Sequence, residues 1–123
     1  PSCWDDAEEE IFNWVETRLT AEMRAGLDCL LVSYYEENCN DFKPDWQRVF
    51  NRLGELFPYA NLGFGEVGVT RRDVKKEYLE EYYTIEVDHP RYIGGYFWWY
   101  YIQDMVPKTK PLWTTLDKVL QEQ

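Results

Sequence analysis

The chain has 123 residues, of which 45% are hydrophobic and 18% aromatic, so it can form one domain over residues 1–123 with its own core. Its 13 basic and 23 acidic residues give a net charge of -10, which argues against a nucleic-acid reader and favours basic partners. The acidic start lacks the pattern of a signal peptide, and no run is long and apolar enough to predict a transmembrane segment.

The cysteine and histidine content argues against redox and metal chemistry. Cys3, Cys29 and Cys39 are odd in number and lack C-x-x-C spacing, and His89 is the single histidine. A disulfide framework and a zinc site are therefore both disfavoured. We expect a reducing cytosolic setting, no metal and no cofactor.

The first half of the chain has the periodicity of amphipathic helices. Apolar residues recur every three to four positions over 4–19 and again over 21–38, and the short link between the two ranges indicates an antiparallel pair. A third helix is predicted over 44–57, because Pro44 and Pro58 flank its apolar stripe.

The second half is also interpreted as mainly helical. Residues 59–68 contain three glycines and predict a loop. A charged helix is predicted to follow over 70–87, although its last residues, YYTIEV, could form a strand instead. The aromatic run 90–105 is predicted to be a core helix, apolar almost all round. A turn at 107–111 and a helix over 112–120 complete an all-α chain.

Motifs that would indicate catalysis are absent from the sequence. The adjacent carboxylates, such as Glu36 and Glu37, are interpreted as solvated helix faces, and there is no phosphate-binding loop or nucleophile motif. We therefore expect no enzyme. The tripeptide Asp88-His89-Pro90 has some likeness to the His-Pro-Asp signature of J-domain cochaperones, but its order differs.

Four segments, in order, resemble the homology motifs of the Bcl-2 family of apoptosis regulators. Residues 8–19 are similar to the fourth motif, 23–35 to the third, 52–64 to the first and 98–113 to the second. The first-type motif keeps its asparagine and glycine but lacks the Trp and Arg of the family pattern. Short loops and divergent sequence favour a virus-encoded survival factor within that family.

The resemblance implies a compact Bcl-2-like bundle of about six to eight helices around a central hydrophobic hairpin. It also implies an anti-apoptotic protein that sequesters Bcl homology 3 helices of the Bim, Bak or Bax type in a hydrophobic groove. The location implied is the host cytoplasm or the mitochondrial outer membrane. The resemblance leaves two alternatives open for the missing groove arginine: either Arg52 or Arg71 replaces it, or both are plain surface charge. The residues expected at the groove are Leu30, Tyr34, Val49, Arg52, Leu53, Leu56, Asn61, Gly63 and Phe64.

The sequence leaves three alternatives open. A homodimer that hides the groove is one alternative to an open monomer. An acidic inhibitor or nucleic-acid mimic, of the anti-defence or immunity type, would act through surface carboxylates instead. A J-like cochaperone around Val69 to Met105 is the third interpretation.

Overall fold

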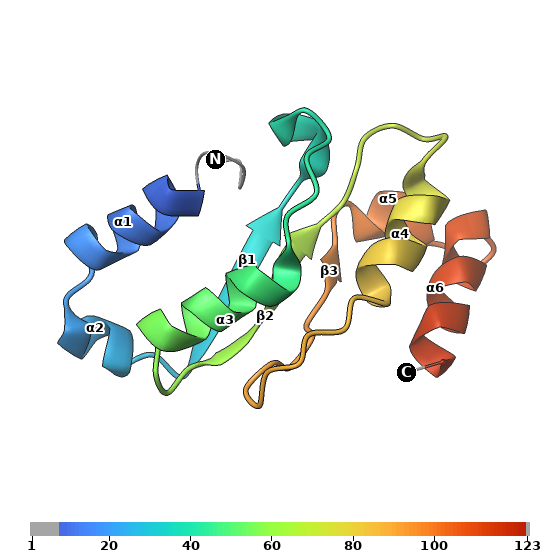
Figure 1. Cartoon of the computed structure of the whole chain (residues 1–123). Coiled ribbons are helices and arrows are strands. Elements are labelled where there is room, and N and C mark those ends of the chain that lie inside the picture. Colours follow the sequence, from blue (N-terminus) through green and yellow to red (C-terminus); the bar gives the residue numbers. More distant parts are fainter. Residues whose placement is uncertain (1–7, 123) are drawn as a thin grey trace.

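The chain folds as a mixed α/β domain, so the expected all-α Bcl-2-like bundle is wrong (Figure 1). The computed structural model describes residues 8–122, with side chains from Phe12 onward. The elements, in chain order, are α1 (Glu8–Arg18), α2 (Ala21–Ala25), β1 (Cys29–Tyr34), the 3-10 helix η1 (Glu36–Cys39), α3 (Trp46–Leu56), β2 (Asn61–Val67), α4 (Lys75–Tyr83), β3 (Phe97–Trp98), α5 (Tyr101–Met105) and α6 (Pro111–Gln121).

The three strands form one parallel sheet in the order β1-β2-β3, with β2 in the centre. Cys29 pairs with Asn61 at the start of the β1–β2 ladder, and the register slips between Val32 and Tyr34. Parallel neighbours need long crossover connections, which α3 and α4 supply here. The carboxyl ends of β1 and β2 consequently meet at one edge of the sheet.

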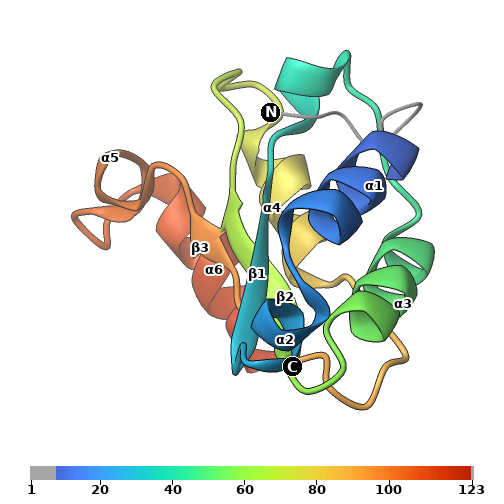
Figure 2. The ribbon, with the colours of Figure 1, turned by 90° about the vertical axis from the view of Figure 1, so that its left-hand side faces the viewer.

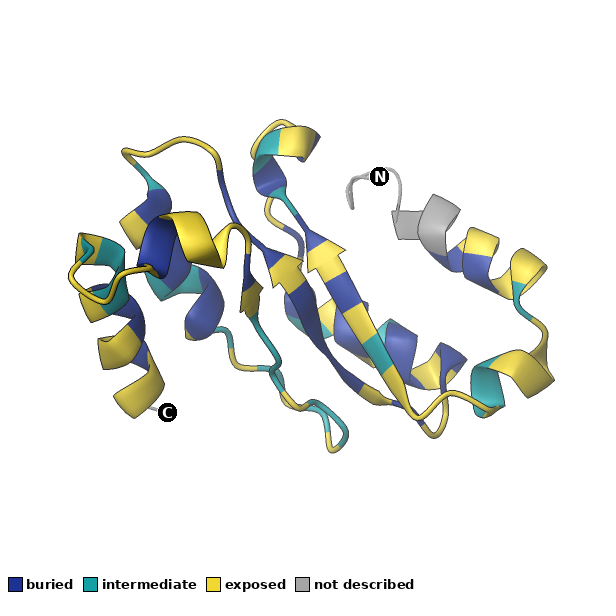
Figure 3. Ribbon diagram, turned by 180° about the vertical axis from the view of Figure 1, so that it is seen from behind, coloured by how far each residue is buried: buried dark blue, intermediate teal, exposed yellow. Residues whose placement is uncertain are grey.

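The core lies between the sheet and the two crossover helices. The ring of Phe64, on β2, contacts Trp46 and Phe50 of α3 at centroid distances of 4.6 and 5.1 Å, and Tyr82 of α4 at 5.7 Å. Both helices therefore cover the same face of the sheet (Figure 2). On the other face, none of the described helices lies across β1 and β2 (Figure 3).

Four predicted helices are found in the structure, where their local sequence signals agree with their burial. The helix expected over 44–57 is α3, in which the Asp45 side chain caps the start by accepting from the Arg48 N–H. The charged helix is α4, shorter than predicted, and the last helix is α6, with Pro111 in its first turn. The first predicted helix corresponds to α1, and residues 4–7 of that prediction lie outside the described residues.

The helix predicted over 21–38 is wrong beyond Ala25. Gly26 ends α2, and β1 follows with an alternating pattern in which Val32 and Tyr34 are buried while Leu31 is exposed. A short apolar run fits both the period of a helix and the period of a strand. Here β-branched Val32 and aromatic Tyr34 favour a strand.

The loop predicted over 59–68 is the central strand β2. Glycine normally weakens a strand, but at Gly63 it is needed because a Cβ there would overlap the carbonyl oxygen of Gly94. The neighbouring chain packs directly against the β2 backbone at this point. Glycine therefore marks a close approach and not a loop.

The predicted core helix over 90–105 is also wrong. Gly94 and Gly95 have φ values of +69° and +79°, a left-handed conformation that ends any helix there. The segment continues instead as β3 and the five-residue α5. Trp98 and Met105 are buried, but most of the other large side chains of β3 and α5 are exposed.

Candidate binding cleft

An open cleft lies at the carboxyl ends of β1 and β2 and has a volume of about 880 Å³. Its walls come from the chain after β1 (Tyr35 to Asn38), the end of β2 (Glu66 to Thr70), the start of α4, and the segment from Trp99 to Gln103. We consider this cleft before a second cavity of about 840 Å³, whose lining includes residues 83–88 and 92–94, because it combines charged side chains with exposed aromatic rings.

Two carboxylates on the cleft wall are held in place by hydrogen bonds. The Tyr35 hydroxyl donates to Oε2 of Glu66 at 2.9 Å, while the backbone N–H and the hydroxyl of Thr70 donate to the two oxygens of Glu37 at 2.9 and 3.0 Å. Burial and the neighbouring Glu66 carboxylate raise the pKa of Tyr35, so this hydroxyl keeps its proton. Each carboxylate can accept further hydrogen bonds, because it has about four lone-pair sites.

Lys75, one of the residues that line the cleft, forms a buried ion pair with Asp104. Nζ of Lys75 is 2.7 Å from both carboxylate oxygens of Asp104, and the indole N–H of Trp98 donates to Oδ2 at 2.9 Å. The Lys75 and Asp104 side chains are 7% and 8% exposed. Burial alone would raise the pKa of Asp104, but the hydrogen bonds from Lys75 and Trp98 outweigh it and lower that pKa. The pair connects the start of α4 to α5.

Exposed aromatic side chains form one lip of the cleft. Trp99 and Tyr100 both line it, are 52% and 46% exposed, and have ring centroids 5.1 Å apart. Phe97 and Ile102 nearby in the sequence are also exposed. A contiguous group of exposed apolar side chains marks an interaction site more often than a single exposed ring does.

The backbone under this lip is fixed by a close approach. A Cβ on Gly68, just after β2, would overlap the carbonyl oxygen of Trp99, so the two backbones are in direct contact. The Trp99 N–H also donates to the carbonyl of Val67 at 2.8 Å. The aromatic lip is thereby held against the carboxyl end of β2.

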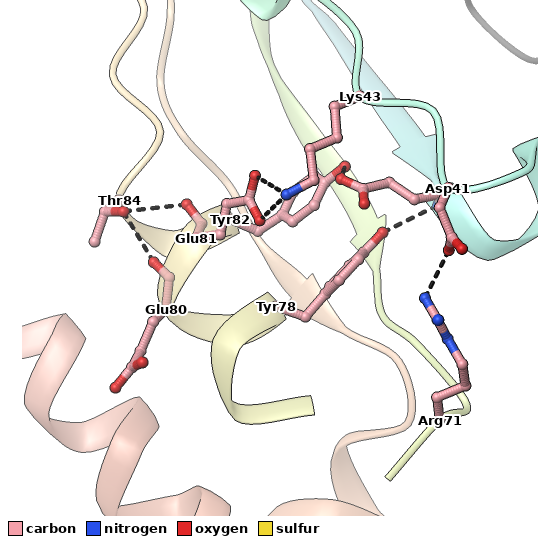
Figure 4. A network of polar contacts seen from close by, with 9 residues as sticks. Asp41, Lys43, Arg71, Tyr78, Glu80, Glu81, Tyr82 and Thr84 are labelled. Carbon is pink, nitrogen blue, oxygen red and sulfur yellow. Dashed lines mark hydrogen bonds and ion pairs between the residues drawn. The ribbon is translucent and has the colours of Figure 1, made fainter. Parts of the chain in front are cut away.

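A second polar network lies next to the cleft, between η1 and α4. Glu36 is only 4% exposed, accepts from the Tyr82 hydroxyl at 2.9 Å, and donates its backbone N–H to the Tyr78 hydroxyl at 3.0 Å. Burial raises the pKa of Glu36. Figure 4 shows Tyr78 and Tyr82 beside the Lys43–Glu81 ion pair, which ties the chain before α3 to α4.

The residues expected to line a helix-binding groove lie in other places. Most of them are buried in the core, namely Tyr34, Val49, Leu53, Leu56, Gly63 and Phe64. Leu30 is half-buried on β1, and Asn61 is exposed at the start of β2, where a helix entry was expected. The structure therefore does not bring these residues together as the wall of an open groove.

The two arginines considered for the groove have acidic neighbours of their own. Arg52 forms ion pairs with Glu16 at 3.1 Å and with Glu55 at 2.7 Å. Arg71 pairs with Asp41 at 2.6 Å. Figure 4 shows the two side chains pointing toward each other. Neither arginine is among the residues that line the cleft.

The cysteine prediction also needs a correction. Cys39, at the end of η1, is disulfide-bonded, while Cys29 is a free, exposed thiol. A dithiol redox centre beside a βαβ unit would need a second cysteine three residues after Cys39, in a C-x-x-C motif. Phe42 occupies that position, so Cys39 is not part of such a motif.

The sequence prediction missed the residues that line the cleft. The available signal was the Gly94-Gly95 pair, which divides the aromatic run and places Trp99 and Tyr100 outside any long helix. No local pattern predicts the pairing of Lys75 with Asp104, because α4 and α5 lie far apart in the sequence.

Comparison with protein-family models, with curated proteins and with solved structures finds no match for this chain. Within residues 8–122, no helix has the length and apolar character needed to cross a membrane. The same part of the chain holds no group of three or more His, Cys, Asp or Glu side chains placed to bind a metal ion.

Proposed function

We propose that this chain is a protein-binding domain that acts without catalysis and holds a peptide segment of a partner protein in the cleft. The observation that carries the proposal is the exposed aromatic lip of Trp99 and Tyr100 on a cleft at the carboxyl ends of β1 and β2. Exposed tryptophan and tyrosine are costly to leave in water and are enriched at the centres of protein interfaces. Binding of this kind needs no cofactor.

The size and walls of the cleft suit a short peptide. A cleft of about 880 Å³ accommodates a few side chains, and its walls combine aromatic rings with fixed polar groups. The Lys75–Asp104 pair and the Gly68 contact hold the segments that form those walls in place, so little ordering energy would be lost on binding.

This proposal replaces the function expected from the Bcl-2 resemblance. Sequestration of Bcl homology 3 helices stays a prediction, but the residues expected to form its groove are largely core residues in a mixed α/β fold. The viral origin and the host-cell location stay predictions in the same way. The acidic-inhibitor alternative is closer to the present proposal, because both involve carboxylates on the surface.

The test is a peptide selection followed by calorimetry. Random 12-residue peptides displayed on phage would be selected against the folded chain, and the enriched peptides would be titrated into the wild type and into Trp99→Ala. We expect micromolar binding that weakens at least about tenfold in Trp99→Ala, in keeping with the loss of a central aromatic residue.

The matched control is Trp14→Ala, which removes a ring that is 56% exposed on α1 and is not part of the cleft lining. Peptide affinity should be unchanged in this variant. A selection that enriches no peptide, or peptides that bind wild type and Trp99→Ala equally, would overturn the proposal. Circular dichroism of each variant shows whether the fold is retained.

A further inference from the structure

We propose that the cleft recognises a positively charged side chain, above all arginine, in the bound segment; this inference rests on the proposed function and names the chemistry of its ligand. Two carboxylates, Glu37 and Glu66, and two cations, Arg72 and Lys75, line the cleft. Lys75 is neutralised by Asp104, which leaves the carboxylates in excess.

The aromatic lip supplies the second element of such a site. The Trp99 and Tyr100 rings lie 5.1 Å apart between centroids, are inclined by 54°, and both line the cleft. A cation over the face of tryptophan or tyrosine is attracted by the negative face of the ring. Aromatic rings beside carboxylates are therefore better suited to a cation than to an anion or a neutral side chain.

The carboxylates are pre-arranged for this role. Glu66 receives the Tyr35 hydroxyl and Glu37 receives two hydrogen bonds from Thr70, so neither side chain has to lose much freedom when a cation binds. The planar guanidinium of arginine can stack on a ring and still donate to a carboxylate, which the ammonium of lysine does less well. We therefore expect arginine to bind more tightly than lysine.

The charge of the whole chain supports the same ligand. A net charge of -10 raises the rate at which basic segments encounter the surface and repels acidic ones. Arg72 works against a cationic ligand in the cleft. Its replacement by glutamine should strengthen binding.

The experiment uses two capped heptapeptides that differ at one atom group. Both have a Gly/Ser background, one with a central arginine and one with a central citrulline, which keeps the shape of arginine without its charge. Binding is followed through the indole N–H signal of Trp99 in ¹⁵N-labelled protein, assigned by its loss in Trp99→Phe. The arginine peptide should bind at least about fivefold more tightly than the citrulline peptide.

Charge-matched variants separate recognition from general attraction. Glu66→Gln and Glu22→Gln each remove one negative charge, but Glu22 lies on α2 and is not part of the cleft lining. We expect Glu66→Gln to weaken the arginine peptide about fivefold, Glu22→Gln to leave it nearly unchanged, and Arg72→Gln to strengthen it.

The outcomes also separate this inference from the proposed function. Equal affinity for the arginine and citrulline peptides, or equal losses in Glu66→Gln and Glu22→Gln, would overturn cation recognition. If phage-selected peptides still required Trp99 in that case, the protein-binding cleft itself would stand. If they did not require it, both proposals would fall.

Discussion

Asp104 and Glu36 are two buried carboxylates whose removal should affect stability very differently. Asp104 is paired with the ammonium of Lys75, whereas Glu36 is buried with a neutral tyrosine hydroxyl as its hydrogen-bond donor. At neutral pH, Asp104→Asn leaves the Lys75 charge buried without its counter-ion. Glu36→Gln removes a buried charge and keeps an oxygen that accepts from Tyr82.

The two variants should differ widely in their free energy of unfolding. Breaking a buried ion pair by removing one partner costs about 3–5 kcal/mol. With a urea m-value of about 1–3 kcal/mol/M for a small domain, Asp104→Asn should lower the midpoint of unfolding by more than about 1 M. Glu36→Gln should change the free energy of unfolding by less than about 1 kcal/mol, because a hydrogen bond between neutral groups replaces a charged one.

The pH dependence has opposite signs for the two groups. The lowered pKa of Asp104 gives stability that is present above its ordinary pKa of 3.8 and is lost as the pH falls through the lowered value. The raised pKa of Glu36 gives stability that is present below its ordinary pKa of 4.5 and is lost as the pH rises through the raised value. Each variant should therefore lack one of these two trends.

The assay is urea unfolding followed by far-ultraviolet circular dichroism between pH 3 and pH 8. Asp104→Asn should differ most from the wild type at neutral pH and least at the acidic end. Glu36→Gln should gain relative to the wild type as the pH rises above 4.5. If both variants lost the same stability at pH 7, or if Asp104→Asn cost nothing, the reasoning from the two environments would be refuted.

Three further variants test the fold and the cleft. Gly68→Ala should lower stability by about 1–3 kcal/mol and weaken Trp99-dependent peptide binding, because its Cβ would overlap the Trp99 backbone; Gly26→Ala, whose Cβ has only ordinary contacts, is the control, and equal melting losses would contradict the argument. Arg91→Lys should lower the melting temperature, because the guanidinium donates to three backbone carbonyls near the end of α3 and an ammonium cannot span them; an unchanged melt would refute this. Leu53→Glu should abolish cooperative unfolding, since Leu53 is 3% exposed; a folded variant would show that this position is open, as a groove requires.

Helices that are marked by local sequence signals could be predicted from the sequence alone. In α3, the Asp45 cap, the flanking prolines and the buried stripe all agree, and its prediction was accurate within two residues at each end. The strands were not predicted, for a different reason. β2 is buried on both faces, and it contains glycines at positions where another backbone or side chain approaches closely. It therefore lacks the alternation of apolar and polar residues that identifies a half-buried strand.

The cleft could not be predicted because its parts meet only in three dimensions. Glu37, Lys75 and Trp99 lie on separate segments, and nothing in their local sequence indicates that they face one cavity. The aromatic run shows the same difficulty. Its composition suits a buried helix, yet Gly94 and Gly95 turn the chain and leave Trp99 on the surface.

The parallel pairing of β1 with β2 has a consequence for the order in which the chain can fold during its synthesis. Cys29 at the start of β1 finds its partner Asn61 only after the whole of α3 has been made. Closing such a long loop is slow and yields no sheet contacts until it is complete. The nascent domain should therefore expose β1 on the ribosome until β2 emerges, and the cleft should form later still, once Asp104 arrives to pair with Lys75.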